Sequence, residues 1–146
     1  MRAVVQRVTS ANVTVDQQII GQIGGGLLVL LGVEQGDRPA DVEYTSDKLV
    51  GLRIFDDADG KMNLAVTEVS GAILLISQFT LLADTRKGRR PSFLQAADPK
   101  TAEDLYEQVA TALRTRVPVS TGRFQAHMLV SLVNDGPVTI LLDSRN

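Results

Sequence analysis

Three polar residues interrupt the most apolar stretch of the chain. Residues 71–84 read GAILLISQFTLLAD, and Ser77, Gln78 and Thr80 lie in a run that otherwise consists largely of side chains suited to burial. A hydroxyl or amide that is buried without a hydrogen-bond partner costs about 1 to 3 kcal/mol. If the stretch is one strand, alternation places Ser77 and Phe79 on one face and Gln78 and Thr80 on the other, so the polar groups share no single solvent-facing side. They either line a pocket at a strand end or form a structural hydrogen-bond network.

Hydroxyl groups in this stretch raise the question of nucleophilic catalysis, but the chain has few groups to activate them. It contains no Cys and one His, His127, which falls in a strand-like stretch, and no Gly-x-Ser-x-Gly elbow is present. A lone His in such a place is more often structural. Thr80 is a candidate nucleophile by position, although a threonine hydroxyl without an adjacent base is a weak nucleophile.

Two clusters imitate ligand-binding loops and fail at particular positions. Residues 21–26 hold four glycines, but Val29 stands where a Gly-x-Gly-x-x-Gly phosphate loop needs its last glycine, so a hairpin turn is predicted there. The acidic residues 56–60 resemble part of a calcium loop, yet Phe55 and Val66 would occupy its first and twelfth positions. We therefore expect no metal and no cofactor.

One dense basic run follows the unusual stretch and contains Arg86, Lys87, Arg89 and Arg90. Cations at a strand end can contact several phosphates and give an affinity that depends on salt. Composition alone favours a solvated loop. The position of the run beside residues 77–80 shifts the prediction towards a nucleic-acid contact.

Residues 134–137 read Asn-Asp-Gly-Pro, a composition typical of a hairpin turn. The bond between Gly136 and Pro137 allows a second interpretation. An X–Pro bond gives up only about 0.5 to 1 kcal/mol on going cis, so a fold can fix that isomer and use it to aim backbone carbonyls. The sequence leaves both interpretations open.

The elements that position these residues are predicted as short strands and two helices. Strands are expected at residues 4–10, 11–16, 27–33, 71–84, 126–133 and 138–142, with a hairpin formed by residues 53–55 and 62–66. The continuous apolar run at 27–33 indicates a central strand covered on both faces. Helices are expected from Asp37 to about Leu52, and from the cap Asp98 to a point before Pro118.

This order lacks regular βαβ alternation, which predicts an α+β fold with a mostly antiparallel or mixed, barrel-like sheet. A chain of 146 residues that is 44% hydrophobic fits a single domain over residues 1–146. A net charge of -2 excludes a nucleic-acid binder held by global positive charge, so any RNA contact must be local. No membrane span or export signal is recognised, and we expect a cytoplasmic protein.

Two short motifs resemble a known family. Residues 77–81, Ser-Gln-Phe-Thr-Leu, and residues 134–139, Asn-Asp-Gly-Pro-Val-Thr, look like the two signature motifs of the D-aminoacyl-tRNA deacylases. The likeness continues through residues 6–8, 53–55, 60–63, 90–93 and 121–124. It spans nearly the whole chain, and only the tail after Leu142 departs from it.

The resemblance implies a hydrolase that cleaves the ester between a D-amino acid, or glycine, and the terminal ribose of tRNA. It also implies a homodimer with two sites at the interface, in which a cis Gly–Pro bond reaches into the partner's site. Carried over to this chain, Ser77, Gln78, Phe79 and Thr80 would line the aminoacyl pocket, while Gly136 and Pro137 would screen chirality. A rigid backbone element excludes an L side chain by steric conflict but does not exclude glycine.

The resemblance further implies a substrate-assisted mechanism. The 2′-hydroxyl of the terminal adenosine would help to activate water, and the N–H groups of Phe79 and Thr80 would hold the developing oxyanion. We favour this route over covalent catalysis by Thr80. Two other functions are kept as alternatives: a non-catalytic RNA-binding module, which explains residues 86–90 but leaves residues 77–80 unused, and a dimerisation domain, which explains only the apolar strands.

Overall fold

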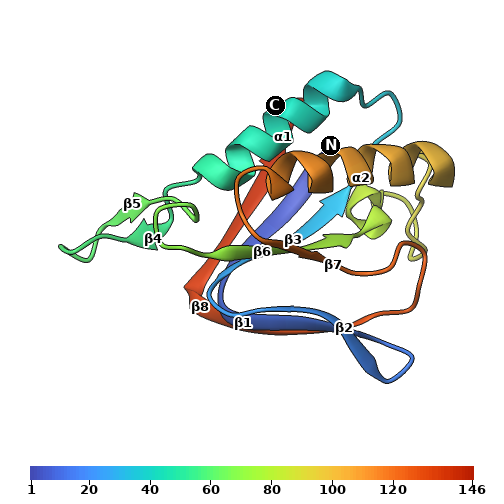
Figure 1. The fold of residues 1–146 in the computed structure, drawn as a ribbon. Helices are drawn as coiled ribbons and strands as arrows, with labels where there is room; N and C mark the ends of the chain where they lie inside the picture. The colour runs from blue at the N-terminus through green and yellow to red at the C-terminus, as the bar shows by residue number, and fades with distance from the viewer.

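A bent, mixed sheet of six strands organises the molecule, and the computed structural model describes all residues 1–146 (Figure 1). Two helices, α1 and α2, lie over one face of this sheet, and a two-stranded hairpin, β4–β5, extends to one side. In chain order the elements are β1 Arg2–Val15, β2 Gln18–Ile23, β3 Gly26–Gly32, α1 Pro39–Gly51, β4 Phe55–Asp56, β5 Met62–Leu64, β6 Ala72–Ser77, the 3-10 helix η1 Phe79–Leu82, α2 Pro99–Arg114, β7 Val119–Thr121 and β8 Leu129–Asp143. The predicted α+β class is confirmed.

The sheet combines antiparallel and parallel pairing. β1 pairs antiparallel with β2, β3 and β8, whereas β3, β6 and β7 run parallel to one another. At the far end of the sheet, β7 comes back towards β2, where the hydroxyl of Ser120 donates to the carbonyl oxygen of Gln22 across 3.2 Å. The sheet is therefore nearly closed, which agrees with the predicted barrel-like form.

The first strand, and the hairpin that follows it, differ from the prediction. The two strands expected at residues 4–10 and 11–16 are the single strand β1. Its hairpin turn is at Asp16 and Gln17, whose positive φ values of 49° and 65° are typical of a type I′ turn. β2 and β3 then run in the same direction along β1, so Gly24 and Gly25 link two consecutive strands. The predicted glycine hairpin was wrong, and β2 was missed.

The strand predicted over residues 71–84 ends at Ser77 and is followed by η1, so the alternation expected for residues 77–80 does not exist. Ser77 pairs with Leu31, and the next amide, that of Gln78, donates to the carbonyl oxygen of Leu31 across 2.8 Å. Because β3 stops at Gly32, the chain has no further partner strand there. β7 was also missed.

The two strands predicted at the end of the chain are one strand, β8, and residues 134–137 are a bulge in it. Both halves of β8 pair with β1: Val133 lies opposite Ser10 and Thr139 opposite Gln6. Four residue steps of β1 thus face six steps of β8, and the extra residues loop out. The hairpin-turn interpretation of this segment was wrong, and the bond between Gly136 and Pro137 is cis.

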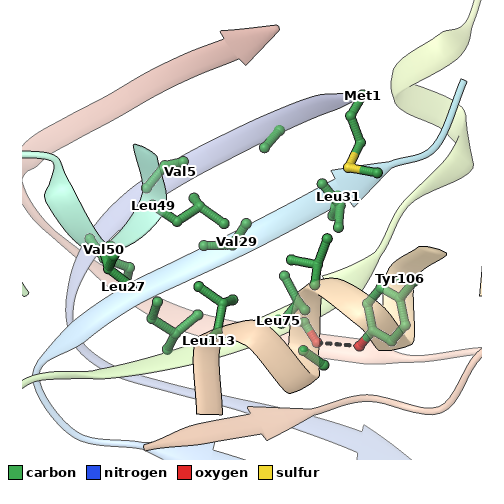
Figure 2. Close-up of a cluster of buried hydrophobic side chains, with 14 of the residues drawn as sticks. Met1, Val5, Leu27, Val29, Leu31, Leu49, Val50, Leu75, Tyr106 and Leu113 are labelled. Atoms are coloured by element: carbon green, nitrogen blue, oxygen red, sulfur yellow. Dashed lines mark hydrogen bonds between the residues drawn. The ribbon is translucent and has the colours of Figure 1, made fainter. Parts of the chain in front are cut away.

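The main core lies between the helices and the sheet (Figure 2). Leu27, Val29 and Leu31 of β3 point into it, whereas Leu28 joins a second cluster on the opposite face with Leu74 and its neighbours. The prediction that residues 27–33 form a central strand covered on both faces is confirmed.

Local signals set the helix boundaries only in part. Asp98 caps α2 as predicted, because its carboxylate accepts a hydrogen bond from the Thr101 amide across 3.1 Å. Asp37 does not cap α1, which begins after Arg38. The Asp37 carboxylate is instead buried against the N-terminal ammonium group of Met1 at 2.8 Å. Neither helix is long and apolar enough to cross a membrane.

Candidate active site

The polar residues of the apolar stretch lie where parallel strands end. Since β3, β6 and β7 are parallel, their carboxyl ends meet at one edge, the usual location of ligand sites in such sheets. A cavity of about 610 Å³ lies at this edge, and Ser77, Gln78 and Phe79 form part of its wall. Pro99 and Ala102, in the first turns of α2, form another part. The structure thus brings three of the four predicted residues onto one cavity.

The lining is mainly apolar with a few polar groups, which is typical of small-molecule sites. Residues 124–128 supply a further wall, on which Gln125 and His127 are polar. Sequence reasoning missed this wall because residues 126–133 were assigned to a strand, whereas β8 begins only at Leu129. His127 is exposed on the cavity wall. The only sign of this wall in the sequence was the resemblance of residues 121–124 to the family.

Thr80 is not on the cavity wall. It is exposed, and its hydroxyl oxygen accepts a hydrogen bond from the side-chain amide of Gln78. An amide N–H donates a proton and cannot remove one, so this contact makes the hydroxyl oxygen less nucleophilic. The geometry gives Thr80 no general base.

The backbone next to Ser77 provides hydrogen-bond donors. Phe79 and Thr80 are the first two residues of η1, and the first N–H groups of a helix have no partner inside it. Such adjacent donors are suited to hold an oxyanion that forms on a carbonyl group. The first turn of η1 thus offers two adjacent uncharged donors next to Ser77.

Gly136 and Pro137 are absent from the wall of this cavity. They belong to the bulge of β8, and Figure 1 shows the sharp bend of β8 on the side of the sheet away from η1. Gly136 has a φ of 128°, a conformation that favours glycine. Within one chain the two signature motifs are apart.

A buried arginine, Arg7 of β1, holds the bulge. Its side chain donates to the carbonyl oxygens of Ile54 at 2.7 Å and Asp135 at 3.1 Å, and it lies near the carboxylates of Asp56 and Asp135 at 3.5 and 3.4 Å. The amide of Asn134 also donates to the backbone oxygens of Arg7 and Val138, at 2.9 and 3.0 Å. The bulge is thus fixed from both sides.

The position of Arg7 in the sequence indicates a buried charge, although no role was predicted for this residue. A charged residue follows Ala3 and Val5 on the core-facing side of β1, where an apolar side chain is expected, and only 8% of its surface is exposed. A buried charge requires partners.

The predicted basic run forms an exposed loop. Two backbone hydrogen bonds between Asp84 and Ser92, of 2.8 and 2.9 Å, close it. Arg86 donates two hydrogen bonds to the Asp84 carboxylate, at 2.9 and 2.6 Å, and these lower the pKa of Asp84 to about 2. Lys87, Arg89 and Arg90 make no ion pair, so their charges face solvent while that of Arg86 is balanced.

No group of three or more His, Cys, Asp or Glu side chains lies close enough together to share a metal ion. What the cavity provides is a set of neutral donors, a single imidazole and an apolar wall.

Comparison with known proteins assigns this arrangement to a family. Residues 4–143 match the model of the family described as D-Tyr-tRNA(Tyr) deacylase. A D-aminoacyl-tRNA deacylase of Kosmotoga olearia is 57% identical over 145 residues, which are 99% of this chain and 98% of the relative.

Two solved structures are similar to the fold. The structure described as c-Myc DNA Unwinding Element Binding Protein has a TM-score of 0.93 and 41% identity, with 98% of each chain covered. A probable eukaryotic D-amino acid tRNA deacylase has a TM-score of 0.81 with 97% of each chain covered, and its 17% identity makes it a likeness of fold alone. The chain belongs to the D-Tyr-tRNA(Tyr) deacylase family.

Proposed function

We propose that this chain hydrolyses the ester between a D-amino acid and the terminal ribose of tRNA, releasing the free amino acid and the tRNA. The observation that carries the proposal is the position of Ser77, Gln78 and Phe79 of the first signature motif on the wall of the cavity, in a member of a deacylase family. Glycine esterified to tRNA is a second substrate in this proposal. A filter that acts on a side chain has nothing to exclude in glycine.

The chiral filter comes from a second copy of the chain. Gly136 and Pro137 do not line the cavity of their own chain, so they act only if they enter another one. β8 has a free outer edge, and it exposes Leu129, Val133 and Leu141 by 60%, 56% and 77%. Exposed apolar side chains on a long edge strand favour coverage by a partner. We therefore propose a homodimer whose subunits exchange their Gly–Pro segments.

Hydrolysis proceeds by attack of water on the ester carbonyl carbon. The adjacent 2′-hydroxyl of the terminal adenosine assists the removal of a proton from water, and the N–H groups of Phe79 and Thr80 hold the resulting oxyanion. The intermediate then collapses, the bond to the ribose oxygen breaks, and that oxygen leaves as a hydroxyl after taking a proton. Thr80 has no covalent role, because its oxygen is hydrogen-bonded to the Gln78 amide.

The function is tested by incubating the purified protein with matched D-tyrosyl-, L-tyrosyl- and glycyl-tRNA and following loss of the ester. We expect hydrolysis of the D-tyrosyl and glycyl esters and not of the L-tyrosyl ester. Equal rates on the D and L substrates would rule out the chiral filter. Binding of charged and uncharged tRNA alike, without ester loss, is the result expected for a non-catalytic RNA-binding module.

The mechanism is tested separately with Thr80→Ala and with a substrate that ends in 2′-deoxyadenosine. The variant should keep most of its turnover, whereas the deoxy substrate should lose most of it. Loss of nearly all turnover in Thr80→Ala with tRNA binding intact, or an acyl group trapped on Thr80, would support the covalent route.

The exposed cations Lys87, Arg89 and Arg90 are the proposed contacts to tRNA phosphates, and the cytoplasm remains the predicted location.

A further inference from the structure

An aromatic pair connects the cavity to the basic loop. Phe79, which lines the cavity, packs edge-on against Phe93, with ring centroids 5.0 Å apart and an interplanar angle of 68°. Phe93 directly follows Ser92, the residue whose backbone bonds to Asp84 close the basic loop. The sequence of contacts from the cavity outward is therefore Phe79, Phe93 and the loop.

The surface formed by Phe79, Phe93 and Leu94 exposes large apolar side chains to solvent. Phe79 is 55% exposed and Leu94, next to Phe93, is 83% exposed, the highest value among the large hydrophobic side chains of the chain. A stable fold gains nothing from leaving such side chains in water, so they are candidates for contact with a ligand.

The charges beside the surface identify the chemistry of that ligand. Lys87, Arg89 and Arg90 face solvent without ion-pair partners, whereas Arg86 is held by Asp84. Aromatic rings next to unpaired cations are the combination that binds single-stranded nucleic acid, because bases stack on the rings and phosphates meet the cations. A partner protein with an apolar surface would leave these cations without a negatively charged partner.

We propose that Phe93 and Leu94 form a stacking site for the unpaired nucleotides that precede the terminal adenosine, with Lys87, Arg89 and Arg90 contacting their phosphates. The proposal rests on the proposed function, because it takes the terminal adenosine and its ester to occupy the cavity beside Phe79. The site reads no base identity, since every base has a face that stacks.

The test compares two substrates, D-tyrosyl-tRNA and D-tyrosyl-adenosine, which carries the same ester but no preceding nucleotide. Phe93→Ala should raise KM for the tRNA about tenfold, as loss of one base stack implies, and should leave kcat/KM for D-tyrosyl-adenosine within about twofold. Phe93→Tyr, which keeps a ring, should behave as the unaltered protein does. Leu94→Ser changes a side chain that is almost fully exposed, so it should fold normally and show the same pattern more weakly.

Ile19→Ser, an equally simple change at a 56% exposed apolar side chain of β2, is the matched control and should affect neither substrate. Equal losses on both substrates in Phe93→Ala would overturn the proposal, because Phe93 would then only support Phe79. No loss on either substrate would also overturn it. A change of oligomeric state in Leu94→Ser, measured by light scattering, would assign the surface to a second copy instead.

Binding separates this proposal from the proposed function. The labelled trinucleotide CCA should bind more tightly than adenosine, and Phe93→Ala should abolish the difference. If neither ester is hydrolysed by the unaltered protein, the proposed function fails, and the trinucleotide measurement still decides whether the stacking site exists.

Discussion

The Nε of Arg7 donates a hydrogen bond to the carbonyl oxygen of Asp135 across 3.1 Å, directly before Gly136 and Pro137. The same guanidinium group reaches the carbonyl oxygen of Ile54. One side chain of β1 therefore sets the position of the bulge in β8 relative to the segment that precedes β4. A Cβ atom added to Gly136 would lie 2.7 Å from Cγ2 of Val138 and 3.1 Å from Nη2 of Arg7, so a larger residue there would require these side chains to move.

Replacing Arg7 should weaken the fold and the chiral filter together. Arg7→Gln leaves the carbonyl oxygens of Ile54 and Asp135 without their donor. Because the Asp56 and Asp135 carboxylates are half exposed and can be hydrated, we expect a loss of about 2 to 3 kcal/mol, below the value for a fully buried pair. Arg7→Lys should recover only part, since an ammonium group does not form the same fork.

Urea unfolding and the ratio of D- to L-tyrosyl-tRNA hydrolysis measure these two effects. Arg53→Gln is the control, because the contacts of Arg53 with Asn63 are exposed. Unchanged stability and an unchanged D/L ratio in Arg7→Gln would contradict the role assigned to Arg7.

Tyr106→Phe should destabilise the core beneath the cavity. The Tyr106 hydroxyl donates to the carbonyl oxygen of Leu75 across 2.8 Å in a buried position (Figure 2). Removing the donor leaves that oxygen unsatisfied in a central strand, so we expect a loss of about 1 to 3 kcal/mol in the free energy of unfolding. Tyr44→Phe, at an exposed position on α1, should change it little. A loss no larger than that of Tyr44→Phe would show that this bond is not stabilising.

The stability difference between the unaltered protein and Tyr106→Phe should shrink at high pH. Burial raises the pKa of Tyr106 above its ordinary value of 10.0, so the hydroxyl keeps its proton in the folded state while it ionises in the unfolded chain. The stabilising contribution is fully present below pH 10 and falls above it by about 1.4 kcal/mol per pH unit. Unfolding free energies of both proteins at pH 9 and pH 11 measure the change. A constant difference would mean that Tyr106 ionises equally in both states.

Removing the unpaired charges of the basic loop should weaken tRNA binding. Arg89→Gln and Arg90→Gln each remove one cation that has no ion-pair partner. We expect KM for D-tyrosyl-tRNA to rise, and the dependence of log(kcat/KM) on log[salt] to become shallower by about 0.7 to 1 per lost phosphate contact. The double variant Asp84→Asn with Arg86→Gln keeps the net charge and should change neither quantity. Equal effects from all of these variants would contradict phosphate contact by Arg89 and Arg90.

The pairing of Arg86 with Asp84 can be checked directly by NMR titration of the Asp84 carboxyl carbon. Hydrogen bonds from Arg86 hold the pKa of Asp84 at about 2, below its ordinary value of 3.8. The contribution of the pair is complete above pH 3.8 and is lost as the pH falls towards 2. In Arg86→Gln the midpoint should return towards the ordinary value. A midpoint near 4 in the unaltered protein would show that the pair does not form in solution.

Elements marked by local chemistry were predictable. Asp98 and Pro99 place the start of α2, and the apolar run at 27–33 indicates a strand buried on both faces, because capping and burial depend on nearby side chains. Residues 134–137 have the same turn chemistry in a hairpin as in a bulge. What decides between them is β1, which pairs with both halves of β8 and is far away in sequence.

In the candidate site too, the parts marked by local sequence were predictable and the parts formed by distant segments were not. Ser77 and Gln78 were identifiable because polar groups in an apolar run need a reason, whereas Phe79 was identifiable only from the family motif that contains it. The wall at residues 124–128 and the role of Arg7 depend on distant segments that meet only in the folded chain. Periodicity carries no information about such contacts.

The central claim is that the cavity of one copy and the Gly136–Pro137 segment of another form one deacylation site. It is tested by mixing two variants, Ser77→Tyr, which fills the cavity, and Gly136→Val, which distorts the bulge. Each alone should be inactive on D-tyrosyl-tRNA, because Ser77→Tyr fills its own cavity and the added side chain of Gly136→Val obstructs the partner cavity that the segment enters. After random subunit exchange, half of the dimers are mixed and each has one intact site of two, so about a quarter of the unaltered activity should return. A mixture that stays inactive after exchange, or a Gly136→Val protein that is fully active by itself, would contradict the claim.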